Sequence, residues 1–218
     1  MMIRQLHIDV FFDFICPWCL IGKRQLLIAI NRFYQLHPKV KVIVHWRGVQ
    51  LIPDLAVEGV PFQTFYLKRL GSLTAVRMRQ EQVNKAANKV GLKIDFEQIK
   101  RMPNTAKAHR LFDKALKIGT PEQCNALLEQ LFAAYFYDGL DIGNTTTLYK
   151  IAKRCGFPRE LIKDLLIQDH QDFISASTGG NGVPYFIFNR ASALVGAQSA
   201  DALYQAMQEA MLAQGELI

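Results

Sequence analysis

The feature that most restricts the fold of this 218-residue chain is the turn Cys16-Pro17-Trp18-Cys19, which joins two different hydrophobic patterns. Residues 5–14 alternate polar and apolar side chains, and this period predicts a strand with one buried face. Residues 17–36 place apolar side chains mostly at helical spacing, and Pro38 stops the helix. The two cysteines are therefore expected at the start of a helix that directly follows a strand.

The rest of the chain predicts a sheet interrupted by a long helical region. A second strand over residues 40–46 completes a strand, helix, strand unit, for which a parallel strand pair is expected. From about Pro61 to Asp172 the pattern is helical only, and Thr120-Pro121-Glu122-Gln123 has the residues of a capping box that starts a helix. The predicted C-terminal elements are strands at 185–188 and 193–195 and a helix at 199–214.

This order predicts an α/β fold in which a βαβ unit and a ββα unit combine into one mixed sheet. The predicted domains are residues 1–60 with 175–218, forming the sheet, and residues 61–174, forming a large inserted helical domain.

Charge and targeting signals narrow the function classes. The formal net charge is +7, but the Lys and Arg residues are interpreted as scattered over many segments, without the aromatic and basic pattern of an RNA-binding motif. We therefore expect no nucleic-acid partner. The first residues show no secretion signal and no apolar run approaches about 20 residues, so a cytoplasmic protein without a membrane span is expected.

Two thiols separated by two residues at a helix start can form a reversible disulfide. Cys16 is expected to attack, because unpaired N–H groups at a helix N-terminus favour a thiolate, and Cys19 is expected to resolve the mixed disulfide. Pro17 suits the first helical position, while Trp18 either offers an apolar surface beside the sulfur or packs in the core.

The same spacing also serves zinc, but structural zinc needs four ligands and no second pair is present, so no metal is expected. Cys124 and Cys155 share the apolar faces of their helices and are interpreted as core residues.

Val183-Pro184 follows a glycine-rich loop and precedes an apolar strand, where proline is normally unwelcome. A cis peptide bond at Pro184 would leave the Val183 backbone free to pair with an extended peptide, and the alternative is a trans-proline at a strand start.

These residues resemble the DsbA-like branch of the thioredoxin superfamily over essentially the whole chain, and more narrowly its FrnE-type cytoplasmic members. The matching segments are Asp13 with Cys16-Pro17-Trp18-Cys19 and Gly22-Lys23, Asn104-Thr105 with Ala108-His109-Arg110, Phe132–Phe136 with Asp141-Ile142, and Gly182-Val183-Pro184 with Gly196-Ala197-Gln198. The resemblance implies that Pro184 is cis and faces the cysteines, and that the helical insertion flanks a substrate groove.

Four further residues keep two interpretations each. By the resemblance, Asn104 and Thr105 help to bind a peptide or thiol ligand, but a helix N-cap explains them equally. His109 is a satisfied, partly buried histidine or contributes to Cys16 activation. Asp13 tunes the thiols or faces water.

The favoured function is an enzyme that reduces or isomerises disulfides of proteins or peptides, with the Cys16–Cys19 disulfide as its redox centre and no bound cofactor. A thiol reductant is expected as its partner, with glutathione a candidate co-substrate, and the chain is a monomer or a homodimer.

Two alternatives stay open. One is a glutathione-dependent isomerase or transferase, similar to kappa-class transferases and hydroxychromene-carboxylate isomerases, which typically carry serine where this chain has Cys16. The other is a non-enzymatic holdase that uses the helical region.

Overall fold

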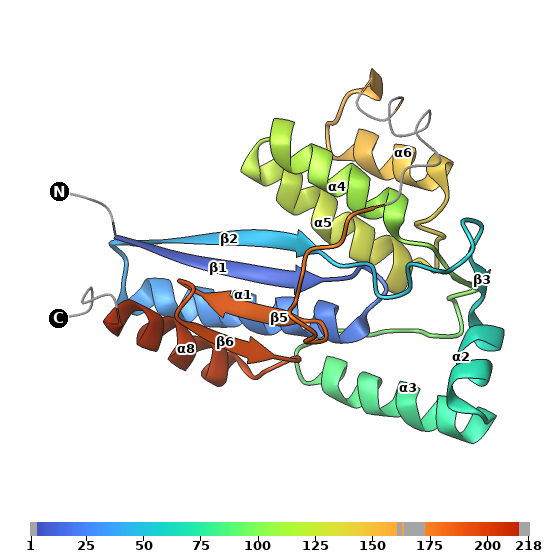
Figure 1. Cartoon of the computed structure of the whole chain (residues 1–218), viewed down its shortest axis with the longest axis horizontal. Coiled ribbons are helices and arrows are strands. Elements are labelled where there is room, and N and C mark those ends of the chain that lie inside the picture. Colours follow the sequence, from blue (N-terminus) through green and yellow to red (C-terminus); the bar gives the residue numbers. More distant parts are fainter. Residues whose placement is uncertain (1–3, 161–162, 164–172, 214–218) are drawn as a thin grey trace. The chain divides into compact units, whose positions relative to one another are not determined.

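The two terminal segments of the chain join in one mixed sheet with the strand order β2-β1-β5-β6, as the computed structural model shows (Figure 1). β1 (Arg4–Phe12) pairs in parallel with β2 (Val40–Gly48) and antiparallel with β5 (Tyr185–Phe188). β6 (Ser192–Val195) then pairs antiparallel with β5. The predicted α/β fold with one mixed sheet is therefore confirmed. The structure describes residues 4–160, 163 and 173–213.

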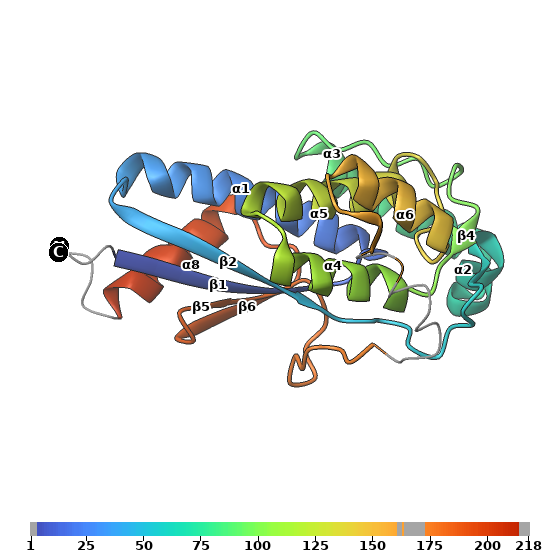
Figure 2. The ribbon, with the colours of Figure 1, turned by 90° about the horizontal axis from the view of Figure 1, so that it is seen from above.

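Two helices, α1 (Pro17–Leu36) and α8 (Ala200–Leu212), pack on one face of this sheet (Figure 2). The alternating β1 residues Leu6, Ile8 and Val10 are buried against them. Ser199 caps α8, because its hydroxyl accepts a hydrogen bond from the Ala202 N–H at 3.2 Å. The predicted helix end at residue 214 lies outside the described residues. The packing of this core holds the end of β1 and the start of α1 in position.

The chain divides into two compact units, residues 1–49 with 175–218 and residues 50–174. The sequence pattern placed the first division at residue 60, at the next element that it recognised. Residues 50–59 form neither helix nor strand, and hydrophobic periodicity cannot assign such a loop to either side. We propose the two units as the domains of the protein, with the first division after Val49.

The second unit contains most of the helices. Their bounds are α2 (Phe62–Leu70), α3 (Leu73–Asn88), α4 (Ala106–Ile118), α5 (Pro121–Phe136) and α6 (Thr145–Arg154). The capping box at the start of α5 is confirmed, since Thr120 and Gln123 exchange both of its hydrogen bonds. Residues 161–162 and 164–172 of the predicted helical region lie outside the described residues.

The prediction of helices alone is wrong at two short strands, β3 (Val60–Pro61) and β4 (Arg101–Met102), which pair antiparallel. Two residues are too few to give a recognisable strand period, so the pairing depends on contacts distant in the sequence.

α4 and α5 form the centre of the second unit. Leu111 and Phe112 of α4 and Leu127 and Leu131 of α5 are almost fully buried. Within the described residues, no helix has both the length and the apolar character needed to cross a membrane.

The cysteines of the helical unit are buried, as expected. The Cys124 thiol donates a hydrogen bond to the Ala115 carbonyl at 3.3 Å. Burial raises the pKa of the Cys124 thiol and of the Cys155 thiol. Both side chains are therefore poor nucleophiles at neutral pH.

Candidate dithiol site

A tight turn places Cys16 at the N-terminus of α1. The Cys16 N–H donates a hydrogen bond to the Asp13 carbonyl at 3.1 Å, which closes the turn after β1. Cys16 is the N-cap of the helix, with extended backbone angles, and Pro17 occupies the first helical turn, where a missing N–H costs nothing. The Cys16 carbonyl accepts the N–H of Cys19 at 3.0 Å. One helical turn therefore holds both cysteines.

The two cysteines approach to 3.3 Å, and both are free thiols in the structure. Cys16 is 6% exposed and Cys19 only 2%. The pKa of the Cys19 thiol is raised well above its ordinary value, mainly because burial disfavours the thiolate, and further by the hydrogen bond and charge of Cys16. Cys19 therefore stays protonated at neutral pH, and its attack on another sulfur requires loss of that proton.

The loop before β5 provides the next contact of the site. The Val183–Pro184 peptide bond is cis, which confirms the prediction at Pro184. The Cys16 thiol donates a hydrogen bond to the Val183 carbonyl, with 3.7 Å between sulfur and oxygen. In the part of the chain that the structure describes, the Val183 N–H makes no hydrogen bond. The structure thus brings Cys16, Cys19, Val183 and Pro184 together.

Gly22, in the second turn of α1, belongs to a segment that matches the DsbA-like branch, but no site role was predicted for it. A Cβ added at Gly22 would lie 3.0 Å from Cγ of Pro184 and 3.2 Å from Cζ of Phe186, so glycine lets the helix approach the proline closely. A glycine inside a helix costs about 1 kcal/mol relative to alanine, and an unexplained cost of this kind usually has a packing reason. That signal could have identified Gly22 from the sequence.

Asp13 lies behind the turn with no exposed surface, so the interpretation that it faces water is wrong. Its negative charge is among the smaller causes that raise the pKa of Cys19. The alternation of polar and apolar residues in β1 suggested an exposed position, but the chain leaves the strand at Phe12 and the alternation ends there. Pro17 and Trp18 are half-buried.

Three other predicted residues belong to the second unit, at the start of α4. The Asn104 carboxamide oxygen accepts the Ala106 N–H at 3.0 Å and also the Gln50 amide at 2.8 Å, so it has the capping role that was one of its two interpretations. Thr105 is buried at the N-cap position, but its side chain makes no capping hydrogen bond. His109 is fully buried, and its ring stacks on Phe173.

Within the described residues, His, Cys, Asp and Glu side chains form no group of three that could hold a metal ion. The chemistry available at this site is that of the two thiols and the backbone of the cis-proline loop.

The profile of the DSBA-like thioredoxin domain family matches residues 7–208. The crystal structure of a probable DsbA oxidoreductase from Streptomyces coelicolor is 25% identical and covers 98% of this chain and 92% of that chain, with a TM-score of 0.83.

Two more distant structures share the fold. The cytosolic disulfide reductase DsbM from Pseudomonas aeruginosa, solved with GSH, is 14% identical, with a TM-score of 0.60 over 96% of this chain and 98% of its own. A 2-hydroxychromene-2-carboxylate isomerase is also 14% identical, with a TM-score of 0.65 over 97% of this chain and 99% of its own.

Proposed function

Because this chain belongs to the DSBA-like thioredoxin domain family, we propose that it is a thiol-disulfide oxidoreductase that reduces or isomerises disulfides of proteins or peptides. The observation that carries the proposal is the pair of free thiols, 3.3 Å apart, at the start of α1. A dithiol with this spacing can close to a disulfide with a small movement.

Cys16 acts first in the proposed reaction. Its thiolate attacks one sulfur of a substrate disulfide, which forms a mixed disulfide and releases the other substrate sulfur as a thiolate that takes a proton from water. Cys16 is the better placed nucleophile, because it occupies the helix N-cap whereas the raised pKa of Cys19 keeps that thiol protonated.

Cys19 completes the cycle. After losing its proton it attacks the Cys16 sulfur, so a Cys16–Cys19 disulfide forms and the second substrate thiolate leaves. Two electrons have then passed from the dithiol to the substrate. Two molecules of a thiol reductant such as glutathione return them and become one glutathione disulfide. In isomerisation a different thiolate of the substrate attacks the substrate sulfur of the mixed disulfide. A new substrate disulfide forms, the Cys16 thiolate leaves, and no net electrons are transferred.

The Val183 backbone is the proposed element that positions a substrate. Its N–H makes no hydrogen bond within the described residues. A carbonyl of an extended peptide lying alongside the loop can accept a hydrogen bond from this N–H. Pro17, Trp18 and Pro184 are proposed to contact the peptide beside the sulfur, whereas Asp13 is proposed to tune the thiols. Ligand binding by Asn104 and Thr105, and tuning by His109, remain proposals that rest on the family resemblance.

Reduction or isomerisation in the cytoplasm is the proposed direction. A reducing glutathione pool keeps most dithiols reduced, and the structural neighbour DsbM is a cytosolic disulfide reductase solved with GSH. A Cys16–Cys19 reduction potential well above that of the glutathione pool would contradict this direction and indicate an oxidase.

The isomerase alternative shares only the fold with this chain, at 14% identity, and it does not need the second thiol. A holdase would need neither thiol. Suppression of aggregation by a variant lacking both cysteines, at the level of the natural protein, would favour the holdase.

The test of the proposed function is insulin-disulfide reduction by Cys16→Ser, with Cys124→Ser as the matched control. Both substitutions replace a buried cysteine, but only Cys16 belongs to the dithiol. We expect the Cys16→Ser rate to fall to that of the reductant alone and the Cys124→Ser rate to remain that of the natural protein. Full activity of Cys16→Ser would refute the dithiol mechanism.

A further inference from the structure

The positive charge of the chain is concentrated in one part of the second unit. Residues 62–93, here called the cationic hairpin, contain α2, α3 and the loop that follows them. This segment carries seven basic residues and one acidic residue, a net charge of +6 out of +7 for the chain. The interpretation that the cations are scattered is therefore wrong for this segment. The seven exposed cations are Lys68, Arg69, Arg77, Arg79, Lys85, Lys89 and Lys93.

Within the described residues, no ion pair neutralises these cations. The ion pairs found among the described residues join Arg32, Arg47 and Arg101 to carboxylates, and none of them involves a cation of the hairpin. Arg79 donates to the Gln82 side chain, which is neutral. Like charges at this density repel one another and attract a partner of opposite charge. An acidic partner would supply the negative charges that these cations can pair with.

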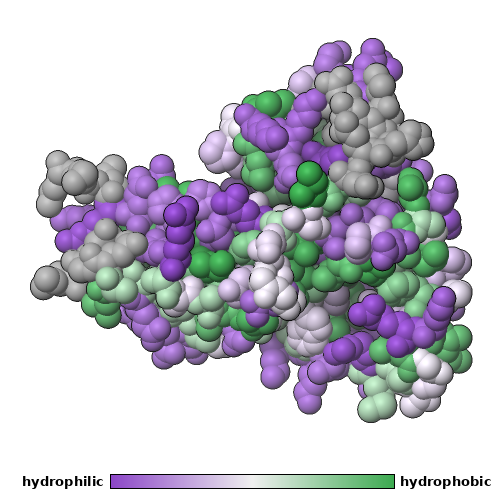
Figure 3. All heavy atoms as spheres, viewed as in Figure 1, coloured by the Kyte–Doolittle hydropathy of each residue, from purple (hydrophilic) through white to green (hydrophobic). Residues whose placement is uncertain are grey.

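Large apolar side chains lie between the cations. Leu67, Leu73 and Met78 are 41%, 60% and 65% exposed. Met78 and Lys85 are seven residues apart and share one face of α3, and Lys89, four residues further on, is the C-cap of that helix. The three residues span about 16 Å at 1.5 Å per residue. Figure 3 shows hydrophilic and hydrophobic residues intermixed on the surface over α2 and α3, at the lower right. An extended peptide of about five residues spans this length.

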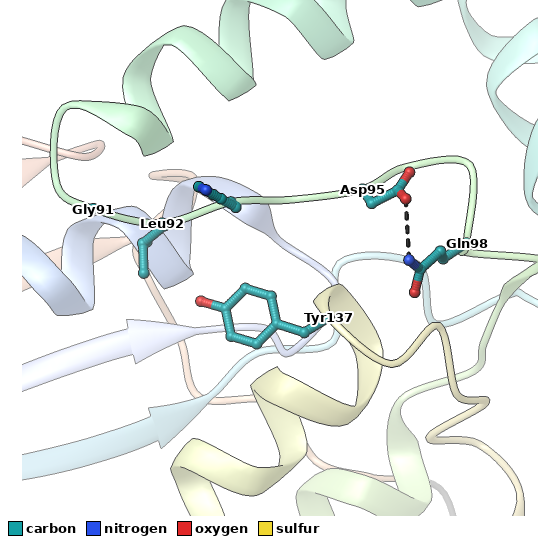
Figure 4. Close-up of a pocket in the computed structure, with 6 residues that line it drawn as sticks. Gly91, Leu92, Asp95, Gln98 and Tyr137 are labelled. Atoms are coloured by element: carbon teal, nitrogen blue, oxygen red, sulfur yellow. Dashed lines mark hydrogen bonds between the residues drawn. The ribbon is translucent and has the colours of Figure 1, made fainter.

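A hollow of about 500 Å³ lies at the end of the hairpin, and Lys93 belongs to both. Leu92 and the Tyr137 ring face one another across it, and Asp95 and Gln98 lie at its other end (Figure 4). The Asp95 carboxylate already accepts hydrogen bonds from the Gln98 amide and the Glu97 N–H. The hollow is apolar at Leu92 and Tyr137, whereas Asp95 and Gln98 make its other end polar. The apolar end next to Lys93 suits a large apolar or aromatic side chain that adjoins a carboxylate.

The chemistry of the hairpin favours a polypeptide over the other anionic partners. Its aromatic residues Phe62, Phe65 and Tyr66 are buried or half-buried and pack on one another, so they provide no exposed platform for bases. The broad apolar face of α3, with Val76 and Val83, is used in the fold, so little remains to enter a bilayer. The exposed Met78 side chain is unbranched and can adapt to peptides of varied sequence.

We propose that the cationic hairpin and the hollow at Lys93 bind an acidic, extended polypeptide segment, with one large apolar side chain of that segment in the hollow. This inference rests on the proposed function in one respect: the segment belongs to the disulfide-bearing substrate. The surface selects acidic substrates, while the dithiol carries out the exchange.

The test measures binding without redox chemistry. A fluorescent ten-residue peptide of Glu and Asp with one central Phe, free of cysteine, is titrated with full-length protein carrying Cys16→Ser and Cys19→Ser. The test variant adds Lys85→Gln, Lys89→Gln and Lys93→Gln. The matched control adds Lys39→Gln, Lys41→Gln and Lys153→Gln instead, which changes the net charge equally at other exposed sites.

Loss of three exposed ion pairs is expected to weaken binding roughly tenfold in the test variant and less than about twofold in the control. Equal affinity of the two variants would overturn the proposal. Tyr137→Ala is expected to weaken binding of the Phe peptide more than binding of a peptide with Ala at the same position. An equal loss of affinity for both peptides would show that the hollow is not part of the binding site. Tighter binding of a basic peptide, of nucleic acid or of anionic phospholipid vesicles would overturn the choice of partner.

The two proposals can fail separately. If Cys16→Ser abolishes insulin reduction but the test and control variants bind the peptide equally, the proposed oxidoreductase function is supported and the proposed peptide site on the cationic hairpin is refuted. If Cys16→Ser keeps full activity while the test variant alone loses binding, the hairpin is a peptide site of a protein that works without the dithiol.

Discussion

Substitution of Gly22 by alanine tests the contact between α1 and the cis-proline loop. The added methyl would lie 3.0 Å from Cγ of Pro184 and 3.2 Å from Cζ of Phe186, whereas carbon atoms prefer separations of about 3.5–4.0 Å. Pro184 and Phe186 are both buried, so neither can move freely into solvent. The methyl therefore has to displace the proline loop or the helix by a few tenths of an ångström.

Two effects of opposite sign determine the stability of Gly22→Ala. Replacing glycine inside a helix by alanine gains about 1 kcal/mol of helix propensity. An extra methyl in a closely packed interior costs about 1–3 kcal/mol. Because the methyl meets two rigid neighbours, we expect packing to dominate, with a net loss of about 1 kcal/mol in the free energy of unfolding. For a chain of this length, that loss lowers Tm by about 2–4 °C.

Urea unfolding of the reduced protein measures this change through the shift in midpoint at constant slope. Gly22→Val is the second member of the series, and its two further methyl groups are expected to enlarge the loss. Insulin reduction by folded Gly22→Ala should also fall, because displacement of Pro184 changes the geometry at Cys16. A gain of about 1 kcal/mol, as helix propensity alone predicts, would refute the packing argument.

Three further predictions concern the thiols, and a fourth concerns the start of α5. Cys19→Ser should accumulate the mixed disulfide between Cys16 and substrate, visible by mass spectrometry under non-reducing conditions, while Cys155→Ser should not. In the natural protein, the rate at which this intermediate resolves should rise about tenfold per pH unit between pH 6 and 8 in a stopped-flow experiment, because the raised pKa of Cys19 leaves little thiolate. Burial is the main cause of the raised pKa of Cys19, and the negative charge of Asp13 adds to it. Asp13→Asn should therefore move the pH profile of the resolution rate to lower pH. An unchanged profile would show that the Asp13 carboxylate does not affect the pKa of Cys19. Thr120→Ala should cost about 1 kcal/mol of stability in urea unfolding without changing the insulin-reduction rate, because it removes the capping box of α5 but touches neither thiol.

The raised pKa of Cys19 also predicts how the free energy of unfolding changes at high pH. An unfolded cysteine ionises near pH 8.5, whereas the folded Cys19 retains its proton. Above that pH the folded state binds more protons than the unfolded state, so stability falls as the pH rises toward the folded pKa. Unfolding in urea at pH 8 and pH 10 should show a smaller loss for Cys19→Ser than for the natural protein, and equal losses would contradict the assignment.

The sequence by itself determined the elements whose signals are local. The helix Pro17–Leu36, the capping box of Thr120 and Gln123, and the strand at residues 185–188 follow from spacing, proline positions and side-chain hydrogen bonds within a few residues. The pairing of Cys16 with Cys19 is also local, because one helical turn sets it. At Pro184 the residues offered a cis bond or a trans-proline at a strand start, and the resemblance to the DsbA-like branch implied the cis bond that the structure has.

Tertiary structure alone decided which of these elements meet. The carbonyl of Val183 reaches the thiol of Cys16 from 167 residues away in the sequence, and the contact that excludes a side chain at Gly22 comes from the same loop. The burial of Asp13 and the short β3–β4 pair likewise depend on packing between distant segments, for which no periodic signal exists. Periodicity specifies the faces of helices and strands, whereas the partners of those faces are selected by the packing of the whole chain.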